Sequence, residues 1–192
     1  MNKGILLITG GRVGSSNLFK SIWTANKQPH HFELDLINDW ASINPSNDVV
    51  KFIPFYDDIT IKEYNYNELI DYNKVLERSK MFGKVIILNR RDKIEQTESL
   101  YVMRVHSNNI HSGRWNDKLI DRDNDTFNNM LSYNKEIDKL LIQLAKDLNI
   151  EMDYYEDVYS SQSINDKSIK LTGHWLTPDK RLRMVDKGTS II

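Results

Sequence analysis

An unbroken apolar run followed at once by a glycine-rich turn limits the choice of fold more than any other feature of the chain. Ile5–Ile8 is apolar without alternation, which is typical of a strand buried on both faces of a parallel sheet. The turn Gly10–Gly14 follows, and apolar residues then recur at helical spacing between Ser15 and Asn26. We therefore expect a strand over Lys3–Thr9, a tight turn and a helix, which is how a βαβ unit begins.

Strands and helices are predicted to alternate along the rest of the chain. The apolar run Val85–Leu88 predicts another doubly buried strand over Lys84–Asn89. The longest amphipathic stripe predicts a helix over Phe127–Leu148, whose apolar residues we assign to the core. The other predicted elements are strands at 48–54 and 150–155 and helices at 66–80 and 93–104. This order predicts an α/β fold, a three-layer sandwich with a mostly parallel central sheet and ligands bound at the carboxyl ends of the strands.

The length of the chain and the absence of a linker predict a single domain over residues 1–192. A polar segment rich in Asn, Asp and His, at about 104–125, is too long for an idle connection and is a candidate lid or binding loop. The formal net charge is -1, which argues against a general binder of nucleic acid or of membrane surfaces.

The chain contains no cysteine, so disulfides and thiolate metal sites are excluded. No apolar segment approaches the length of a membrane span or of a signal peptide, and we expect a cytoplasmic protein. His106 and His111 are five positions apart, whereas helical metal pairs are four apart, and no third ligand is evident. We therefore expect no metal site.

The glycine turn has the composition of an anion cradle. Its glycines allow backbone N–H groups to point inward, and the start of the following helix adds partial positive charge. Arg12 offers a fixed cation, and Ser15 and Ser16 offer hydroxyl groups. The usual ATP- or GTP-binding loop needs a lysine directly after its last glycine, but Ser15 follows Gly14. An enzyme of that type is therefore disfavoured.

This turn resembles the 5′-phosphosulfate loop of sulfotransferases that use 3′-phosphoadenosine-5′-phosphosulfate, whose fold is P-loop-like. Many members read R-S-G-S-T, and here Val13 replaces the first serine while Ser16 takes the place of the threonine. In the family, an arginine at the end of a central strand and a serine about two helical turns later bind the 3′-phosphate of the donor. Arg90 and Arg91 end the predicted strand, and Ser99 follows them by nine and eight positions.

The string R-R-D-K-x-x-Q-x-x-S-x-Y, which begins at Arg90, resembles the branch that contains bacterial trehalose 2-sulfotransferase. Tyr155–Val158 is similar to a YED[LV] segment that is mainly structural in these enzymes. Lys51, within Val50–Phe52, is similar to a lysine on a strand in members of the branch. The resemblance covers scattered motifs over about 3–103 and 127–158. The same charged string also fits a solvated helix start capped by Asp92.

The resemblance implies a sulfotransferase that moves a sulfuryl group from 3′-phosphoadenosine-5′-phosphosulfate to an acceptor hydroxyl and leaves adenosine 3′,5′-bisphosphate. Arg12 would stabilise the charge on the transferring group, so no metal is required. The acceptor is expected to be a carbohydrate or another small molecule, bound by a monomer or by a homodimer that completes the pocket. The donor-binding residues implied by the resemblance are Gly11, Arg12, Val13, Gly14, Ser15, Ser16, Arg90, Arg91 and Ser99.

The acceptor hydroxyl needs a base. Glu33 is the first candidate, because it lies twenty-one positions after Arg12, a separation similar to that in the trehalose branch. His30, His31 and Asp35 are alternatives, since the mammalian cytosolic relatives use a histidine. The residues expected to contact the substrate are Lys51 and His31.

Two other functions stay open at this stage. One is a non-catalytic member of the fold, which binds a nucleotide and serves as a partner module. Evidence that Glu33 does not act as a base would favour this function. The other is an atypical P-loop kinase, for which Asp57 or Asp58 would have to hold magnesium. The kinase hypothesis leaves the segment from Arg90 to Ser99 unexplained.

Overall fold

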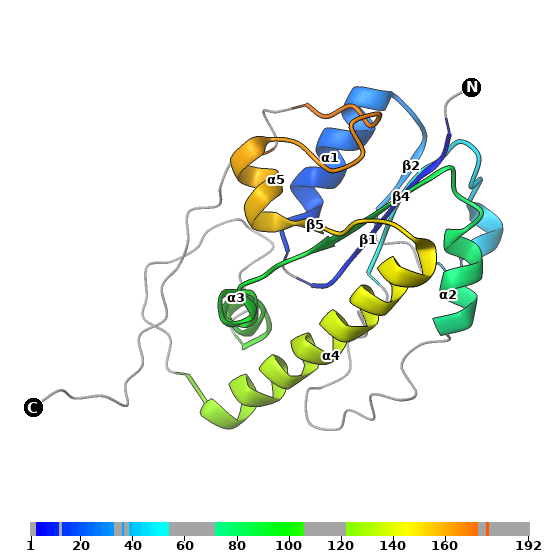
Figure 1. The fold of residues 1–192 in the computed structure, drawn as a ribbon. Coiled ribbons are helices and arrows are strands. Elements are labelled where there is room, and N and C mark those ends of the chain that lie inside the picture. Colours follow the sequence, from blue (N-terminus) through cyan, green and yellow to red (C-terminus); the bar gives the residue numbers. More distant parts are fainter. Residues whose placement is uncertain are drawn as a thin grey trace, which may run out of the picture.

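A parallel sheet forms the middle layer of the molecule (Figure 1). The computed structural model describes residues 3–11, 13–32, 36, 39–53, 72–105, 122–172 and 176, with backbone alone at 102–105. In these residues the sheet has five strands in the order β2-β3-β1-β4-β5, and every neighbouring pair is parallel. The strands are β1 (Ile5–Thr9), β2 (His30–His31), β3 (Val49–Phe52), β4 (Lys84–Asn89) and β5 (Asp153–Tyr154).

Helices cover both faces of this sheet, so the predicted α/β sandwich is confirmed (Figure 1). They are α1 (Ser15–Asn26), α2 (Tyr72–Ser79), α3 (Lys93–Val105), α4 (Asn124–Leu148) and α5 (Tyr155–Ser161), with a short 3₁₀ helix, η1 (Trp40–Ser42). Successive residues of a strand point to opposite faces. Ile5 and Leu7 accordingly pack with α1 and α5, whereas Leu6 and Ile8 pack with α2 and α4. This double burial explains why the first strand is apolar without alternation.

The predicted helices are found, with small changes at their ends. Helix α1 has the predicted bounds, and α3 extends one residue beyond its predicted end. Helix α4 begins three residues earlier than predicted, because the Asp123 carboxylate accepts hydrogen bonds from the N–H groups of Asp125 and Thr126. Helix α2 lies within the predicted range, whose first residues are outside the described part of the chain.

One predicted edge strand has the wrong bounds, and two elements, β2 and α5, were not predicted. The last strand was expected over 150–155, but β5 has only two residues, and Tyr155 begins α5, a helix that was not predicted. The segment before β5 leaves α4 through Asn149, and Ile150 and Met152 then pack on the α4 side of the core. The other edge strand, β2, was not predicted because two histidines carry no strand pattern.

The connections of the two central strands leave the sheet toward opposite faces. The chain passes from β1 into α1 on one face, whereas it passes from β4 through α3 into α4 on the other. Because β1 and β4 are neighbours, their carboxyl ends form the switch point at which open α/β sheets bind ligands. The fold thus directs attention to the turns after β1 and β4.

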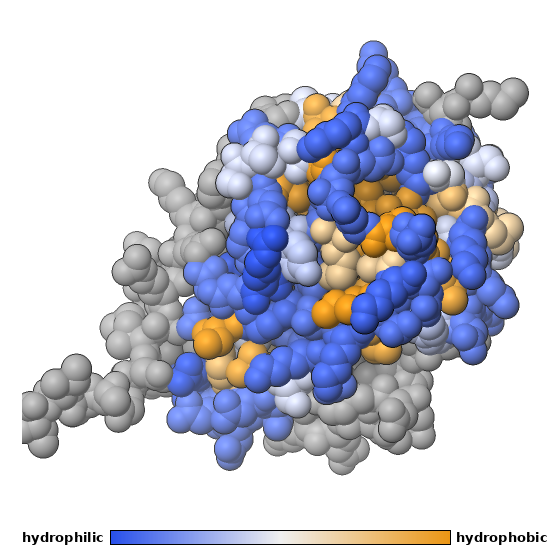
Figure 2. Space-filling model, in the orientation of Figure 1, coloured by the Kyte–Doolittle hydropathy of each residue, from blue (hydrophilic) through white to orange (hydrophobic). Residues whose placement is uncertain are grey.

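Figure 2 shows a mostly hydrophilic face, with apolar residues gathered between α4 and the layer of α1 and α5. Strand β5 pairs only with Leu88 and Asn89, so Val85 earlier in β4 is only partly buried. None of the helices in the described ranges is long and apolar enough to cross a membrane.

Candidate functional site

The glycine turn after β1 is fixed by its conformation and by two tyrosines. Gly14 precedes α1 in the left-handed region, with φ 73° and ψ 9°, and a Cβ atom there would lie 2.7 Å from the Tyr155 ring. The Tyr159 hydroxyl donates a hydrogen bond to the Gly14 carbonyl at 2.6 Å. In the first turn of α1, Ser15 is buried and Ser16 is half-buried, and their N–H groups come before the first carbonyl that the helix could offer them. The turn therefore presents backbone donors at a helix start, as an anion site requires.

The two segments singled out in the sequence meet in space. Thr9 pairs with Leu88, so the turns after β1 and β4 leave the same edge of the sheet side by side. Gln96, on the first turns of α3, donates a hydrogen bond from its Nε2 to the Gly11 carbonyl at 2.8 Å. Ser99 is half-buried one helical turn after Gln96. The glycine turn and the segment that begins at Arg90 thus line one region.

Arg90 is the buried cation of this region, with 7% of its surface exposed. Its Nη2 lies 2.5 Å from the Glu95 carboxylate, and its guanidinium carbon is 4.8 Å from the centre of the Tyr155 ring. Its Nε has no hydrogen-bond partner within the described structure. A buried N–H without a partner costs roughly 1–3 kcal/mol, so an acceptor that reached it would be stabilised.

Arg91, in contrast, is engaged by α5. Its guanidinium forms two hydrogen bonds with the Asp157 carboxylate, at 2.6 and 2.5 Å, and half of its side chain is exposed. The hydrogen bonds from Arg91 lower the pKa of Asp157 below its usual range. The backbone N–H groups of Arg91 and Asp92 donate to the Glu156 carboxylate. Arg91 therefore ties the turn after β4 to α5, and Arg90 is the better donor to a ligand.

Asp92 caps α3, as the alternative interpretation of the charged string predicted. Its Oδ1 accepts a hydrogen bond from the Glu95 N–H at 2.9 Å. Capping and anion binding use different residues of the string, so the two interpretations are compatible.

A polar network fastens the same region to α4. The Lys93 ammonium lies 2.9 Å from the Asp138 carboxylate and 2.7 Å from the Asn89 side-chain oxygen. The Asn89 amide also donates to Asp138, and Lys93 reaches the Gln96 oxygen at 3.4 Å. Burial lowers the pKa of Lys93. The network continues through Gln96 to Gly11, so α4 and the glycine turn are connected by side chains.

Lys51 lies on the other side of β1 from Arg90. Its side chain is almost fully buried, with 1% exposed, and its Nζ is 3.2 Å from the Ser16 hydroxyl. The ammonium also lies 4.1 Å from the centre of the Phe32 ring, which is half exposed. The site thus has a cation on each side of the glycine turn.

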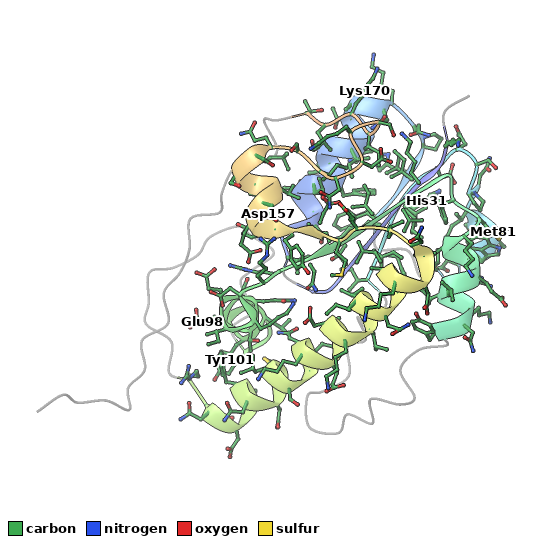
Figure 3. All side chains as sticks on the ribbon, in the orientation of Figure 1. His31, Met81, Glu98, Tyr101, Asp157 and Lys170 are labelled. Carbon is green, nitrogen blue, oxygen red and sulfur yellow. The ribbon has the colours of Figure 1, made fainter. Side chains whose placement is uncertain are left out.

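The structure does not bring His31 together with these residues. His31 Nε2 is 2.9 Å from the Asp48 carboxylate, which also accepts from the Asn44 N–H. By strand alternation His31 faces the α2 and α4 side of the sheet, whereas Lys51 faces α1. Figure 3 shows His31 far from Asp157 and α5. His30 stacks on Trp23 with ring centres 4.2 Å apart. His30 therefore contributes to the packing of α1 against β2.

Three of the predicted functional residues, Arg12, Glu33 and Asp35, lie outside the described residues. So do Asp57 and Asp58, and most of the predicted polar insert, over 106–121, which includes both of its histidines. The insert is bounded by the described ends of α3 and α4. Within the described ranges, no group of three or more His, Asp or Glu residues is placed to hold a metal ion.

Sequence reasoning missed the contribution of α5. Tyr155, Tyr159 and Glu156 contact both turns of the site, although the segment was interpreted as mainly structural. Gln96 is the glutamine of the matched string, but its hydrogen bond to the glycine turn could be recognised only in the folded structure. No protein-family model, curated protein or solved structure matches the chain.

Proposed function

We propose that the chain is a sulfotransferase that uses 3′-phosphoadenosine-5′-phosphosulfate. The observation that carries the proposal is the hydrogen bond from Gln96 to Gly11, which joins the glycine turn to the segment of Arg90 at the switch point of the sheet. A donor with phosphate groups at two ends needs two anion sites close together on one edge. Both motifs on which the resemblance rests lie there.

The residues of this edge fit such a donor. The start of α1 offers backbone donors for the 5′-phosphate, together with Ser15 and Ser16. Arg90 offers a buried guanidinium whose Nε has no partner in the described structure, which suits the 3′-phosphate. Because Glu95 already binds one end of this guanidinium, the phosphate would share Arg90 with it or displace it. Arg91 is assigned a supporting role, because Asp157 occupies its guanidinium.

The order of the strands also supports a proposed position for the acceptor. With the 3′-phosphate near β4 and the 5′-phosphate at the turn after β1, the sulfuryl group would face β3, where Lys51 lies against Ser16. The acceptor oxygen forms a bond to sulfur as the bond from sulfur to the bridging oxygen breaks. The hydroxyl proton passes to a base, and the electron pair leaves on adenosine 3′,5′-bisphosphate. Glu33 remains the proposed base, and Arg12 remains the proposed partner of the departing oxygens.

Calorimetric titration of the whole chain tests the proposal. We expect micromolar binding of adenosine 3′,5′-bisphosphate and much weaker binding of ATP. Arg90→Ala should abolish measurable binding, whereas Arg91→Ala, which removes a neighbouring cation already paired with Asp157, should weaken it far less. Preferential binding of ATP, or no binding of the bisphosphate, would contradict the proposal.

A transfer assay tests the reaction itself. The chain is incubated with the donor and with a panel of phenols and carbohydrates, and sulfated products are identified by mass spectrometry. Lys51→Met should remove product formation with less effect on binding of the bisphosphate, because Lys51, beside Ser16, is proposed to face the acceptor. A variant with equal loss of both would show that Lys51 supports the fold.

A further inference from the structure

Helix α5 contacts both halves of the candidate site, and we propose that it sets their geometry. In this proposal Tyr159 positions the glycine turn and Glu156 positions the turn after β4. Neither residue needs to touch the ligand, so both are positioning residues. The inference rests on the proposed function for the choice of ligand.

Tyr159 acts on the peptide unit that links Gly14 to Ser15. Its hydroxyl donates to the Gly14 carbonyl at 2.6 Å, and that carbonyl also accepts from the N–H groups of Asn17 and Leu18. The Gly14–Ser15 peptide is trans, as are all described peptide bonds, so the Ser15 N–H points opposite to the carbonyl. Fixing the carbonyl therefore fixes the direction of an N–H group that the 5′-phosphate is expected to use.

Glu156 acts on the backbone directly after Arg90. Its carboxylate accepts from the N–H of Arg91 at 3.1 and 3.2 Å and from the N–H of Asp92 at 3.2 Å. Asp157, the next residue of α5, binds the Arg91 guanidinium. These contacts determine where the chain leaves β4, and hence where the Arg90 guanidinium lies.

Tyr155 connects the two halves within the helix. One part of its ring lies beside Gly14, and the Arg90 guanidinium lies over the same ring at 4.8 Å. Val158, 1% exposed, anchors α5 in the core, and the rings of Tyr155 and Tyr159 lie tilted by 35° with their centres 4.5 Å apart. A shift of this seven-residue helix would therefore move both anion-binding turns together.

The test compares ligands that use one half of the site or both. Adenosine 5′-monophosphate reports on the glycine turn, adenosine 3′-monophosphate reports on Arg90, and adenosine 3′,5′-bisphosphate reports on both. The affinities of the two monophosphates are measured by competition against the bisphosphate, because a competition experiment can measure dissociation constants in the millimolar range. We expect Tyr159→Phe to weaken the 5′-monophosphate about fivefold, the effect of one hydrogen bond, and the 3′-monophosphate less than about twofold.

Glu156→Ala should give the opposite pattern, weakening the 3′-monophosphate by about fivefold or more, and both variants should weaken the bisphosphate. Glu156→Gln keeps one acceptor oxygen and should restore part of the loss. The matched controls are Tyr72→Phe, which removes a hydrogen bond to Asp147, and Glu136→Ala, which removes an ion pair with Lys139. Both controls should bind all three ligands as the wild type does.

The outcomes separate the two proposals. A wild-type chain that binds none of the three ligands contradicts the proposed function. If the wild type binds the bisphosphate and either α5 variant binds it equally well, the positioning proposal is overturned. Equal weakening of both monophosphates by each variant also overturns it, because that result describes general loosening. Glu156 is only half-buried, so its variants should fold even if Tyr159→Phe does not.

Discussion

The two turns of the candidate site are held in different ways. The turn after β1 depends on backbone conformation and on close packing: Gly14 is left-handed and lies against the Tyr155 ring. The turn after β4 depends on charge, with Arg90 on Glu95 and Arg91 on Asp157. The difference teaches that two parts of one candidate site can respond to different perturbations. The glycine turn should respond to added volume, and the β4 turn should respond to pH, salt and loss of charge.

The largest effect should come from adding one methyl group to the glycine turn. Gly14→Ala would place a Cβ in a left-handed residue and 2.7 Å from the Tyr155 ring. The conformational cost and the overpacking together should lower the free energy of unfolding by about 3 kcal/mol. Gly11→Ala is the matched control, because a Cβ there has no neighbour within 4 Å, and it should change stability by less than about 0.5 kcal/mol. Urea unfolding measures both, and equal effects would contradict the packing argument.

The next largest effect concerns pH and a buried carboxyl of β5, beside the end of β4. Burial raises the pKa of Asp153 to about 6, although the Asn165 N–H donates to its carboxylate. Its folded-state pKa is above the unfolded one, so the folded state binds more protons between pH 4 and 6. This group therefore lowers stability as pH rises across that window, by on the order of 2 kcal/mol.

The variant Asp153→Asn should remove this slope from the stability profile, as measured by urea unfolding at a series of pH values. Gly11→Ala leaves every carboxyl in place and should keep the wild-type slope. A slope that survives in Asp153→Asn would mean that another group causes it.

A smaller effect is expected from the network under the β4 turn. Asp138→Ala would leave the Lys93 ammonium and the Asn89 amide without their shared acceptor. The loss of stability should be about 1–2 kcal/mol. Glu136→Ala, on the exposed side of the same helix, should cost less than about 0.5 kcal/mol. Similar losses in the two variants would show that the network is as weak as a surface ion pair.

The smallest effect should come from the exposed pair of Arg91 and Asp157. Arg91 lowers the pKa of Asp157, so the pair adds stability above the usual range of the carboxyl and loses it as pH falls through the lowered pKa. Asp157→Asn should therefore be slightly less stable than the wild type at neutral pH and equal to it in strong acid. High salt should also reduce the difference. A difference that is unchanged by acid and by salt would show that the contact does not depend on charge.

Much of the fold follows from local patterns in the sequence. The runs Ile5–Ile8 and Val85–Leu88 predict the central strands because doubly buried strands are apolar throughout. The periodicity of the sequence predicts helices α1, α3 and α4 to within three residues of their observed ends. Edge strand β2 was not predicted, and β5 was predicted too long, because two residues carry no period and are selected by pairing with β3 and β4.

The site was predictable in part. The glycine turn and Arg90 can be identified from the sequence, because the turn needs glycine residues and because both belong to motifs of recognisable spacing. The contacts of Tyr159, Glu156 and Gln96 could not be predicted from the sequence, because each joins segments that are 65 to 145 positions apart in the chain. His31 shows the reverse problem: its residue type suited a base, but strand alternation turned it to the other face.

The end of β4 is fastened to both outer layers of the sandwich by consecutive residues. Asn89 donates to Asp138 of α4, and Arg90 lies on the Tyr155 ring of α5. A ligand bound at the end of β4 would therefore stabilise the helices on both faces of the sheet. Hydrogen exchange should accordingly slow in α4 and α5 together, even though the two helices lie on opposite faces of the sheet.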